Sequence, residues 1–211
     1  MQIKPFVFNS FQVNTFVLYD DSKECIIIDP ACYALEEYNE LYKFIGDNGL
    51  MPKYIANTHG HVDHLLGVKT VSEHYNIPFK VHEDDFFLLE TAVQSGLIFG
   101  FNINENPVAD EILKEGEIIK FGNSELELFH VPGHSPGSIV FYSKEGAFVV
   151  VGDVLFKSSI GRTDLPGGNY EDLISGIRSK LLTLPPETIV LSGHGPHTTI
   201  KNEHDTNPFL T

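Results

Sequence analysis

The chain contains few basic residues: 14 lysines and arginines stand against 29 aspartates and glutamates, and the net charge is −15. A nucleic-acid-binding domain normally presents a basic face, so nucleic acid is not an expected partner. An anionic membrane surface is disfavoured for the same reason. The charge also argues weakly against strongly anionic substrates, although a bound metal ion can reverse the field locally.

Cysteine is nearly absent, with only Cys25 and Cys32 among 211 residues. Two cysteines without a CxxC pair make no disulfide framework, and free thiols fit a reducing compartment. No hydrophobic run approaches the length that crosses a bilayer. The segment Met1–Phe8 lacks a charged region followed by an apolar one, so no secretion signal is expected. These absences predict a soluble, cytoplasmic protein with no membrane partner.

The rest of the composition is that of a globular domain, because 42% of the residues are hydrophobic. No repeat, low-complexity segment or linker is evident, so residues 1–211 are expected to form a single domain. Strands are expected at Ile3–Phe8, Val13–Tyr19, Cys25–Ile28, Lys53–Thr58, Pro78–His82, Ile118–Phe121, Leu126–Val131, Ile139–Tyr142, Phe148–Val151 and Ile189–Leu191. Helices are expected at Ala34–Ile45, Leu65–Tyr75, Asp84–Ser95 and Tyr170–Leu182. Strands grouped in both halves, with helices between them, predict two packed sheets flanked by helices.

One segment, Gly96–Asp110, mixes aromatic residues with glycine, proline and asparagine. We expect a flexible, partly apolar loop that sets substrate choice. Phe86 and Phe87, just before it, are expected in the core. Phe99 and Phe101 belong either to the core or to a lid on the substrate side, and the sequence leaves both interpretations open.

The densest chemical feature is the segment Thr58–His64, with the sequence Thr-His-Gly-His-Val-Asp-His. Three imidazoles and one carboxylate within six residues, after a strand, suit zinc, iron or manganese. Three more candidates each follow an apolar run, so the full set is His59, His61, Asp63, His64, His134, Asp153 and His194. Isolated histidines are usually surface or core residues, and we interpret the others in that way: His74, His82, His130, His197 and His204.

Seven ligands are enough for two metal ions. His59 and His61 point to the same side of an extended segment and can form a three-histidine site with His134. The remaining ligands can form a second site, and Asp153 can bridge the two. A catalytic metal site keeps an open coordination position, whereas a purely structural metal-binding module is saturated. Seven ligands over two ions leave open positions, which favours catalysis.

These motifs resemble the metallo-β-lactamase superfamily. The resemblance rests on Thr58–His64, on Pro132–Gly137 (Pro-Gly-His-Ser-Pro-Gly), on Gly152-Asp153 and on Ser192–Pro196 (Ser-Gly-His-Gly-Pro). Gly161–Gly168 is similar to a short, single-domain subgroup of the glyoxalase II (hydroxyacylglutathione hydrolase)-like branch. The resemblance covers about residues 12 to 200.

The resemblance implies a four-layer αββα sandwich, an α/β (α+β) fold. It also implies two divalent metal ions; zinc is the principal expectation, and iron and manganese are the alternatives. One ion would be held by His59, His61 and His134, the other by Asp63, His64 and His194, with Asp153 bridging. Asp63 and Asp153 are the expected catalytic carboxylates. The implied reaction is hydrolysis of a small acyl thioester by a metal-bound hydroxide.

Two residues outside the ligand set each have two interpretations. Arg162 lies where the branch places a basic residue near the substrate carboxylate, and a structural ion pair with Asp164 is the alternative. Asp29 ends an apolar strand and either orients a ligand histidine or is an ordinary strand-ending aspartate. The branch's enzymes that use glutathione carry a further helical domain after the last ligand, which this sequence does not contain, so glutathione recognition is in question.

Other activities remain as alternatives. The principal one is a mononuclear iron persulfide dioxygenase of the same superfamily, with His59, His134 and Asp153 as its iron ligands. A phosphodiesterase or nuclease is disfavoured by the negative charge, and a β-lactamase by the missing secretion signal. Gly133–Gly137 matches the GxSxG pattern of serine hydrolases, but β-type sequence follows Ser135 where that motif requires a helix.

Overall fold

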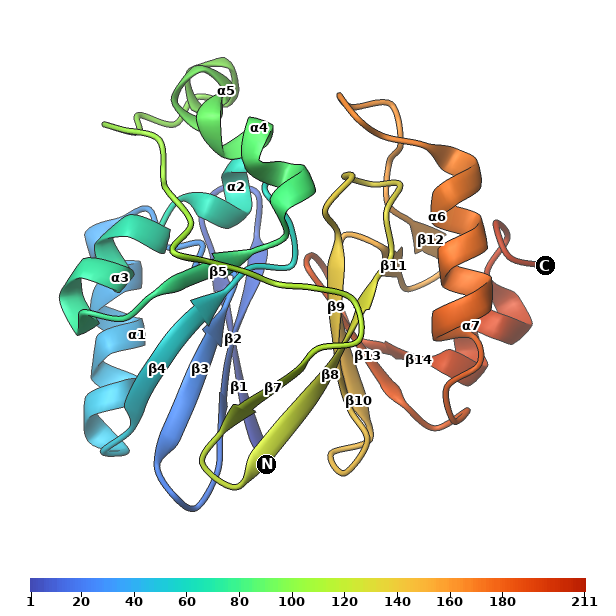
Figure 1. Ribbon diagram of the computed structural model, residues 1–211, viewed down its shortest axis with the longest axis horizontal. Coiled ribbons are helices and arrows are strands. Elements are labelled where there is room, and N and C mark those ends of the chain that lie inside the picture. Colours follow the sequence, from blue (N-terminus) through green and yellow to red (C-terminus); the bar gives the residue numbers. More distant parts are fainter.

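The computed structural model describes residues Met1–Thr211 as two six-stranded sheets packed against each other, with helices outside both (Figure 1). The first sheet, in spatial order, contains β1 (Gln2–Phe8), β2 (Val13–Tyr19), β3 (Glu24–Ile28), β4 (Met51–Ala56), β5 (Phe79–Val81) and β6 (Glu111–Ile112). The second contains β14 (Thr198–Thr199), β13 (Ile189–Ser192), β10 (Phe148–Gly152), β9 (Ile139–Ser143), β8 (Ser124–His130) and β7 (Ile118–Phe121). The strands β11 (Leu155–Phe156) and β12 (Ser159–Ile160) form a small separate pair.

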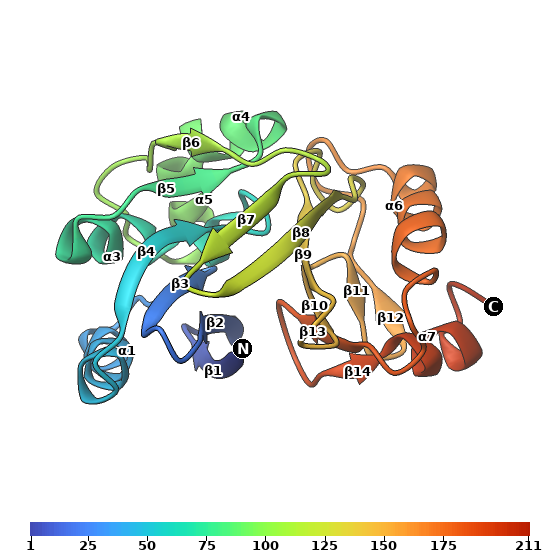
Figure 2. The same cartoon turned by 60° about the horizontal axis from the view of Figure 1, so that its bottom comes forward.

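The helices make the outer layers, as both views show (Figure 2). On the side of the first sheet lie α1 (Leu35–Asp47), α2 (Val62–Leu65), α3 (Val68–Tyr75), α4 (Phe86–Glu90) and α5 (Ala92–Phe99). On the side of the second lie α6 (Tyr170–Gly176), which continues into a π-helical turn at Ile177–Leu181, and α7 (Ile200–Thr206). The predicted sandwich of two sheets flanked by helices is confirmed.

The strands carry apolar side chains on both faces because both faces are covered. In β2, Phe16 and Leu18 point into the layer between the sheets, whereas Val13 and Val17 point toward the helices. In β3, Ile26 and Ile28 join the inter-sheet layer and Ile27 the helical layer. This alternation follows from the two-residue period of a strand.

Three predicted helices differ from those observed. The helix expected at Leu65–Tyr75 is divided into α2 and α3 around Gly67, where a Cβ would lie 2.5 Å from the Pro30 carbonyl oxygen. The helix expected from Asp84 begins as a 3₁₀ turn (Glu83–Asp85) and is interrupted at Thr91, between α4 and α5. The helix expected through Leu182 changes to the π-helical turn after Gly176.

The expectations for the aromatic segment were partly wrong. Residues up to Phe99 belong to α5, and the left-handed Gly100 (φ 84°) ends that helix. Phe101 is a core residue, only 3% exposed, with its ring packed on Phe11 and Tyr33. Phe87, expected in the core, is 38% exposed instead, because it lies on the face of α4 that turns toward a cavity.

None of the helices is long and apolar enough to span a bilayer.

Candidate metal centre

The seven candidate ligands all lie at one end of the sandwich. His59 and His61 follow β4, and Asp63 and His64 belong to α2. His134 lies in the loop between β8 and β9. Asp153 and His194 follow β10 and β13, which are parallel neighbours, so their carboxyl ends meet at the same edge. The structure thus brings together residues that are up to 135 positions apart.

The side chains form two adjoining clusters that can each hold a metal ion. In one, the ligand atoms of His59, His61 and His134 lie within 4.8 Å of one another, and in the other those of Asp63, His64 and His194 do so. Asp153 lies between them. Its Oδ2 is 3.6 Å from His134 Nε2 and 3.4 Å from His194 Nε2, which is the arrangement that a bridging carboxylate requires.

Three buried polar atoms in these clusters lack any hydrogen-bond partner within the chain: His59 Nε2, His61 Nε2 and Asp153 Oδ1. Buried polar atoms are nearly always paired, so three orphans at one point need an explanation. Imidazole nitrogens and a carboxylate oxygen are common ligands of divalent cations. The residues therefore fit a metal centre.

The electrostatics of the first cluster favour metal binding. Burial and the neighbouring imidazoles hold the pKa of His59 well below its usual value and lower that of His61 to about 3. Both rings are then neutral at physiological pH, and a histidine must be neutral to ligate.

The second cluster is rich in carboxylates. Burial opposes protonation of His194, but its hydrogen bonds to Asp153 and Asp63 prevail and raise its pKa to about 10. Without a cation, the His194 imidazole would be protonated on both nitrogens and positively charged at neutral pH. Metal binding at this cluster must therefore release a proton.

Hydrogen bonds to acceptors behind the centre fix the orientation of three ligand rings. Nδ1 of His64 donates to Asp29 Oδ2 at 2.9 Å, Nδ1 of His134 to the Arg162 carbonyl oxygen at 2.9 Å, and Nδ1 of His194 to the Phe11 carbonyl oxygen at 2.9 Å. With Nδ1 occupied as a donor, Nε2 is the nitrogen of each ring that can ligate a metal ion, once it carries no proton.

Asp29 fits the orienting role better than that of an ordinary strand-ending aspartate. Its side chain is buried and accepts hydrogen bonds from Thr58 N (2.7 Å) and Thr58 Oγ1 (2.7 Å) in addition to His64. It therefore connects the end of β3 to the segment that carries four of the ligands.

One positioning residue has no signal in the sequence. Asp85 is fully buried, and its carboxylate accepts hydrogen bonds from Gly60 N (2.7 Å), Gly137 N (2.6 Å) and Ser135 Oγ (2.8 Å). It thereby ties the loop of His59 and His61 to the loop of His134. Glu83-Asp84-Asp85 looks like the exposed acidic start of a helix, so nothing in the pattern singled it out. The hydrogen-bond partners of Ser135 Oγ are Asp85 and Ser138 rather than a histidine, which argues against a serine nucleophile.

A cavity of about 390 Å³ opens directly over the clusters. Its lining includes His61, Asp63, His134, Asp153 and His194 at the base. The walls come from three segments far apart in the sequence: Phe11; Phe87, Leu88, Thr91, Ser95 and Phe99; and Arg162, Leu165 and Pro166. Of the two interpretations of Arg162, the ion pair is present: Nε and a terminal nitrogen donate to Asp164 at 2.7 and 2.8 Å.

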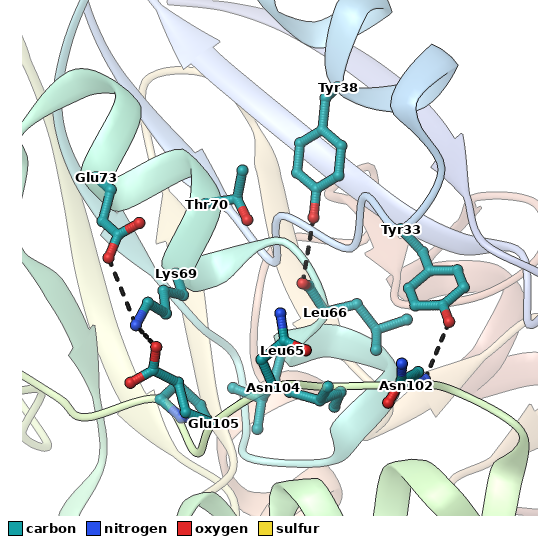
Figure 3. A pocket seen from close by; sticks show the side chains of 12 residues that line it. Tyr33, Tyr38, Leu65, Leu66, Lys69, Thr70, Glu73, Asn102, Asn104 and Glu105 are labelled. Atoms are coloured by element: carbon teal, nitrogen blue, oxygen red, sulfur yellow. Dashed lines mark hydrogen bonds and ion pairs between the residues drawn. The ribbon is translucent and has the colours of Figure 1, made fainter.

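A second cavity, of about 300 Å³, lies between α3 and the segment after α5 and contains none of the candidate ligands (Figure 3). Its polar groups are bonded to one another. Lys69 lies between Glu73 and Glu105, and Tyr33 Oη accepts a hydrogen bond from Asn102 N at 3.0 Å. These contacts anchor the segment that follows α5 to the body of the protein.

His82 and His130, interpreted as isolated histidines, stack on each other with ring centroids 4.2 Å apart and an interplanar angle of 14°. Asp84 lies nearby, so the three residues could in principle hold an ion. Nearly parallel rings direct their lone pairs in parallel rather than toward one point, and His130 Nε2 is already bonded to the Pro136 carbonyl oxygen. The arrangement is a packing contact.

Comparison with known proteins agrees with this geometry. Residues 9–194 match the model of the metallo-beta-lactamase superfamily, and the chain belongs to that superfamily. It is 41% identical over 201 residues to the probable metallo-hydrolase YqgX of Bacillus subtilis, covering 94% of this chain and 92% of the relative. It is 39% identical over 212 residues to the hydroxyacylglutathione hydrolase GloC of Haemophilus influenzae, covering 100% and 98%.

Two solved structures are similar over nearly the whole chain. The B3 metallo-beta-lactamase BLEG-1 matches with a TM-score of 0.91 and 40% identity, covering 100% of both chains. The protein TTHA1623, solved in a di-iron-bound form, matches with a TM-score of 0.88 and 37% identity, covering 98% of this chain and 100% of its own. Family and clusters together support a metal-binding hydrolase.

Proposed function

We propose that this protein is a thioesterase of the hydroxyacylglutathione hydrolase type with a dinuclear metal centre. The observation that carries the proposal is the position of the two clusters, joined by Asp153, at the base of a cavity open to a small molecule. The similarity to the hydroxyacylglutathione hydrolase at 39% identity supports the same reaction class.

The proposed metal ligands are His59, His61 and His134 for one ion and Asp63, His64 and His194 for the other, with Asp153 shared. Two divalent ions held there would supply Lewis acidity, making hydroxide available near neutral pH and polarising the thioester carbonyl. Zinc is the first expectation. Iron is the principal alternative, since the similar protein TTHA1623 holds two iron ions.

The chain's own groups have two tasks in this reaction. The cavity walls hold the thioester with its carbonyl carbon toward the clusters. Asp63 and Asp153, the proposed catalytic carboxylates, line the cavity base, where they can orient the attacking water and accept its proton. The departing thiolate is stable as an anion, with a thiol pKa of about 8.5, so no strong protein acid is required. This agrees with the absence of an uncommitted acid in the lining.

The test combines metal analysis with an assay of thioester hydrolysis. Purified protein should contain close to two divalent ions per chain by elemental mass spectrometry and hydrolyse S-lactoylglutathione with a kcat/KM of about 10⁴ M⁻¹s⁻¹ or more. Asp153→Asn should lose most of the activity, whereas the control His197→Asn, at an exposed histidine outside the centre, should retain it. Negligible turnover of both S-lactoylglutathione and an uncharged thioester by metal-replete protein would contradict the proposal.

One observation favours the persulfide dioxygenase as a second candidate. The His59 and His134 rings are 4.9 Å apart at their centroids and Asp153 is 3.6 Å from His134, which is a two-histidine, one-carboxylate set suited to iron. Oxygen uptake with glutathione persulfide by iron-loaded protein, without thioester hydrolysis, would establish this activity. A β-lactam assayed in parallel would test the activity that the name of BLEG-1 gives.

A further inference from the structure

The cavity over the candidate metal centre has an unusually apolar wall. Phe87 and Leu88 from α4, Phe99 from α5 and Phe11 from the β1–β2 loop all line it. The Phe11 and Phe99 rings meet edge to face with centroids 5.7 Å apart. The three phenylalanines are 38% to 46% exposed, so their rings are open to whatever enters the cavity.

This wall is held in place before any ligand arrives. Phe101, behind Phe11, is buried and packs on both Phe11 and Tyr33. Tyr33 in turn accepts the backbone hydrogen bond of Asn102, just after α5 (Figure 3). Binding of an apolar substrate against this wall is favoured by about 25 cal/mol for each Å² of apolar surface that is removed from water.

The cavity offers no free positive charge away from the candidate metal ligands. Arg162 is the only lysine or arginine in the lining. Its guanidinium donates two hydrogen bonds to the Asp164 carboxylate, and this lowers the pKa of Asp164 to about 2. One edge of the guanidinium that could receive a substrate carboxylate is therefore occupied by a carboxylate of the chain.

The backbone of this loop leaves little room for rearrangement. A Cβ at Gly161 would lie 1.9 Å from the Asp153 carbonyl oxygen, and one at Gly168 would lie 2.4 Å from the Thr163 carbonyl oxygen. The loop therefore fits tightly against the centre. If Arg162 is to leave Asp164 and pair with a substrate carboxylate, its exposed side chain must therefore move while the backbone stays in place.

We propose that the cavity selects uncharged, apolar thioesters over anionic glutathione thioesters, and that Asp164 sets this preference by occupying the Arg162 guanidinium. The proposal rests on the proposed thioesterase function. The volume of about 390 Å³ fits it, because this value lies at the lower end of the range of about 300–1,000 Å³ for small-molecule cavities. A cavity of this size can enclose a compact acyl group against the apolar wall.

The experiment compares two thioesters that share a phenylacetyl group and differ in the thiol: uncharged N-acetylcysteamine or glutathione, with its two carboxylates. Thiol release by metal-replete protein gives kcat/KM for each. We expect the uncharged thioester to be favoured about fivefold or more, since an unpaired anion receives no partner in this cavity. Equal values, or a preference for the glutathione thioester, would overturn the proposal.

The variant Asp164→Asn isolates the role of the ion pair. Freeing Arg162 should raise kcat/KM for the glutathione thioester about three- to fivefold, as expected for an exposed ion pair, with the uncharged thioester unchanged. The matched control is Asp205→Asn, which removes the partner of Lys201 from another exposed pair at 2.8 Å. Asp205→Asn should alter neither substrate. No change in Asp164→Asn would refute its part in selectivity.

A second variant tests the apolar wall. Phe87→Ala should lower kcat/KM for both phenylacetyl thioesters by about tenfold, since a large apolar contact is lost. The control Phe209→Ala removes a ring of similar exposure, 42%, outside the cavity and should have no effect. An unchanged Phe87→Ala would show that the wall does not contact the substrate.

A binding measurement separates this proposal from the proposed reaction. S-methylglutathione is a thioether that cannot be hydrolysed, and its affinity can be measured by calorimetry. Asp164→Asn should bind it about threefold more tightly than the original protein does. If no thioester is hydrolysed but this shift is observed, the thioesterase function fails and the role of Asp164 stands. If thioesters are hydrolysed without the shift or the preference, the thioesterase function stands and the role of Asp164 fails.

Discussion

Asp29 Oδ2 lies 2.9 Å from His64 Nδ1, and both side chains are buried from solvent. Nδ1 of His64 therefore carries the proton, and Nε2 faces Asp63, Asp153 and His194. A carboxylate behind a ligand imidazole increases the basicity of the ligating nitrogen. If the clusters hold metal ions as proposed, Asp29 acts on the metal centre through His64, without being a ligand itself.

We therefore expect Asp29→Asn to reduce metal affinity about 10- to 100-fold while leaving the fold intact, because an amide retains one acceptor but loses the charge. Competition with a chelator of known affinity measures this change. Asp21→Asn, at an exposed position in the turn between β2 and β3, is the control and should behave as the original protein. Unaltered affinity in Asp29→Asn would assign Asp29 a purely structural role.

Asp85 should contribute both to the stability of the fold and to metal occupancy. Asp85→Ala would leave the N–H groups of Gly60 and Gly137 without an acceptor in the interior, whereas the Ser135 hydroxyl keeps Ser138 as a partner. Each unsatisfied donor costs about 1–3 kcal/mol, so we expect a decrease of about 2 kcal/mol or more in the free energy of unfolding, measured by denaturant titration of metal-free protein. Metal occupancy should fall in parallel, since both ligand loops lose their common anchor. The exposed neighbour change Asp84→Asn should have little effect on either quantity.

Acid stability should depend on Asp20, which joins the turn after β2 to the β7–β8 hairpin of the other sheet. Burial opposes its ionisation, but hydrogen bonds from Ser22, Ser124 and Asn123 prevail and lower its pKa from 3.8 to about 2. A depressed pKa in the folded state stabilises the fold above pH 3.8, and this contribution disappears as the pH falls through about 2.

Asp20→Asn should therefore be less stable than the original protein at neutral pH, and the difference should shrink as the pH falls from 4 to 2. Thermal unfolding of metal-free protein followed across this range measures the effect. A difference that stays constant with pH would show that ionisation of Asp20 does not contribute.

Metal removal should destabilise the protein. A ligand at 100 times its dissociation constant stabilises the folded state by about 2.7 kcal/mol, and each kcal/mol shifts the Tm of a domain of this size by about 2–4 °C. We expect dialysis against a chelator to lower the Tm by about 5–10 °C. The chelator should have little further effect on Asp153→Asn, which lacks the shared ligand.

Much of this organisation could be predicted from the sequence, because two signals in it are local. The strands are short apolar runs rich in β-branched and aromatic residues, and their grouping in both halves of the chain predicted the two sheets. Four candidate ligands occupy one six-residue segment, and the other three each follow an apolar strand; the structure places all seven at one end of the sandwich. Their identity as metal ligands remains a proposal.

What could not be predicted depends on contacts distant in the sequence. Phe87 lies in an apolar run of the sequence, yet it lines the cavity, whereas Phe101 stands between glycine and asparagine, yet it is in the core. Phe101 is buried because its ring packs against Phe11 and Tyr33, which are distant in the sequence. The role of Asp85 could not be predicted because its hydrogen-bond partners are 25 to 52 residues away in the sequence. The division of a helix at Gly67 likewise arises from the close approach of Pro30.

The distance along the chain between His64 and His194, 130 residues, also has a consequence for biosynthesis. A ribosome adds about 5–20 residues per second, so roughly 6–26 seconds separate the appearance of these two ligands. During that interval His134 completes the first cluster, but the second cluster still lacks His194. If the clusters hold metal ions as proposed, full loading can only follow the synthesis of His194, late in translation.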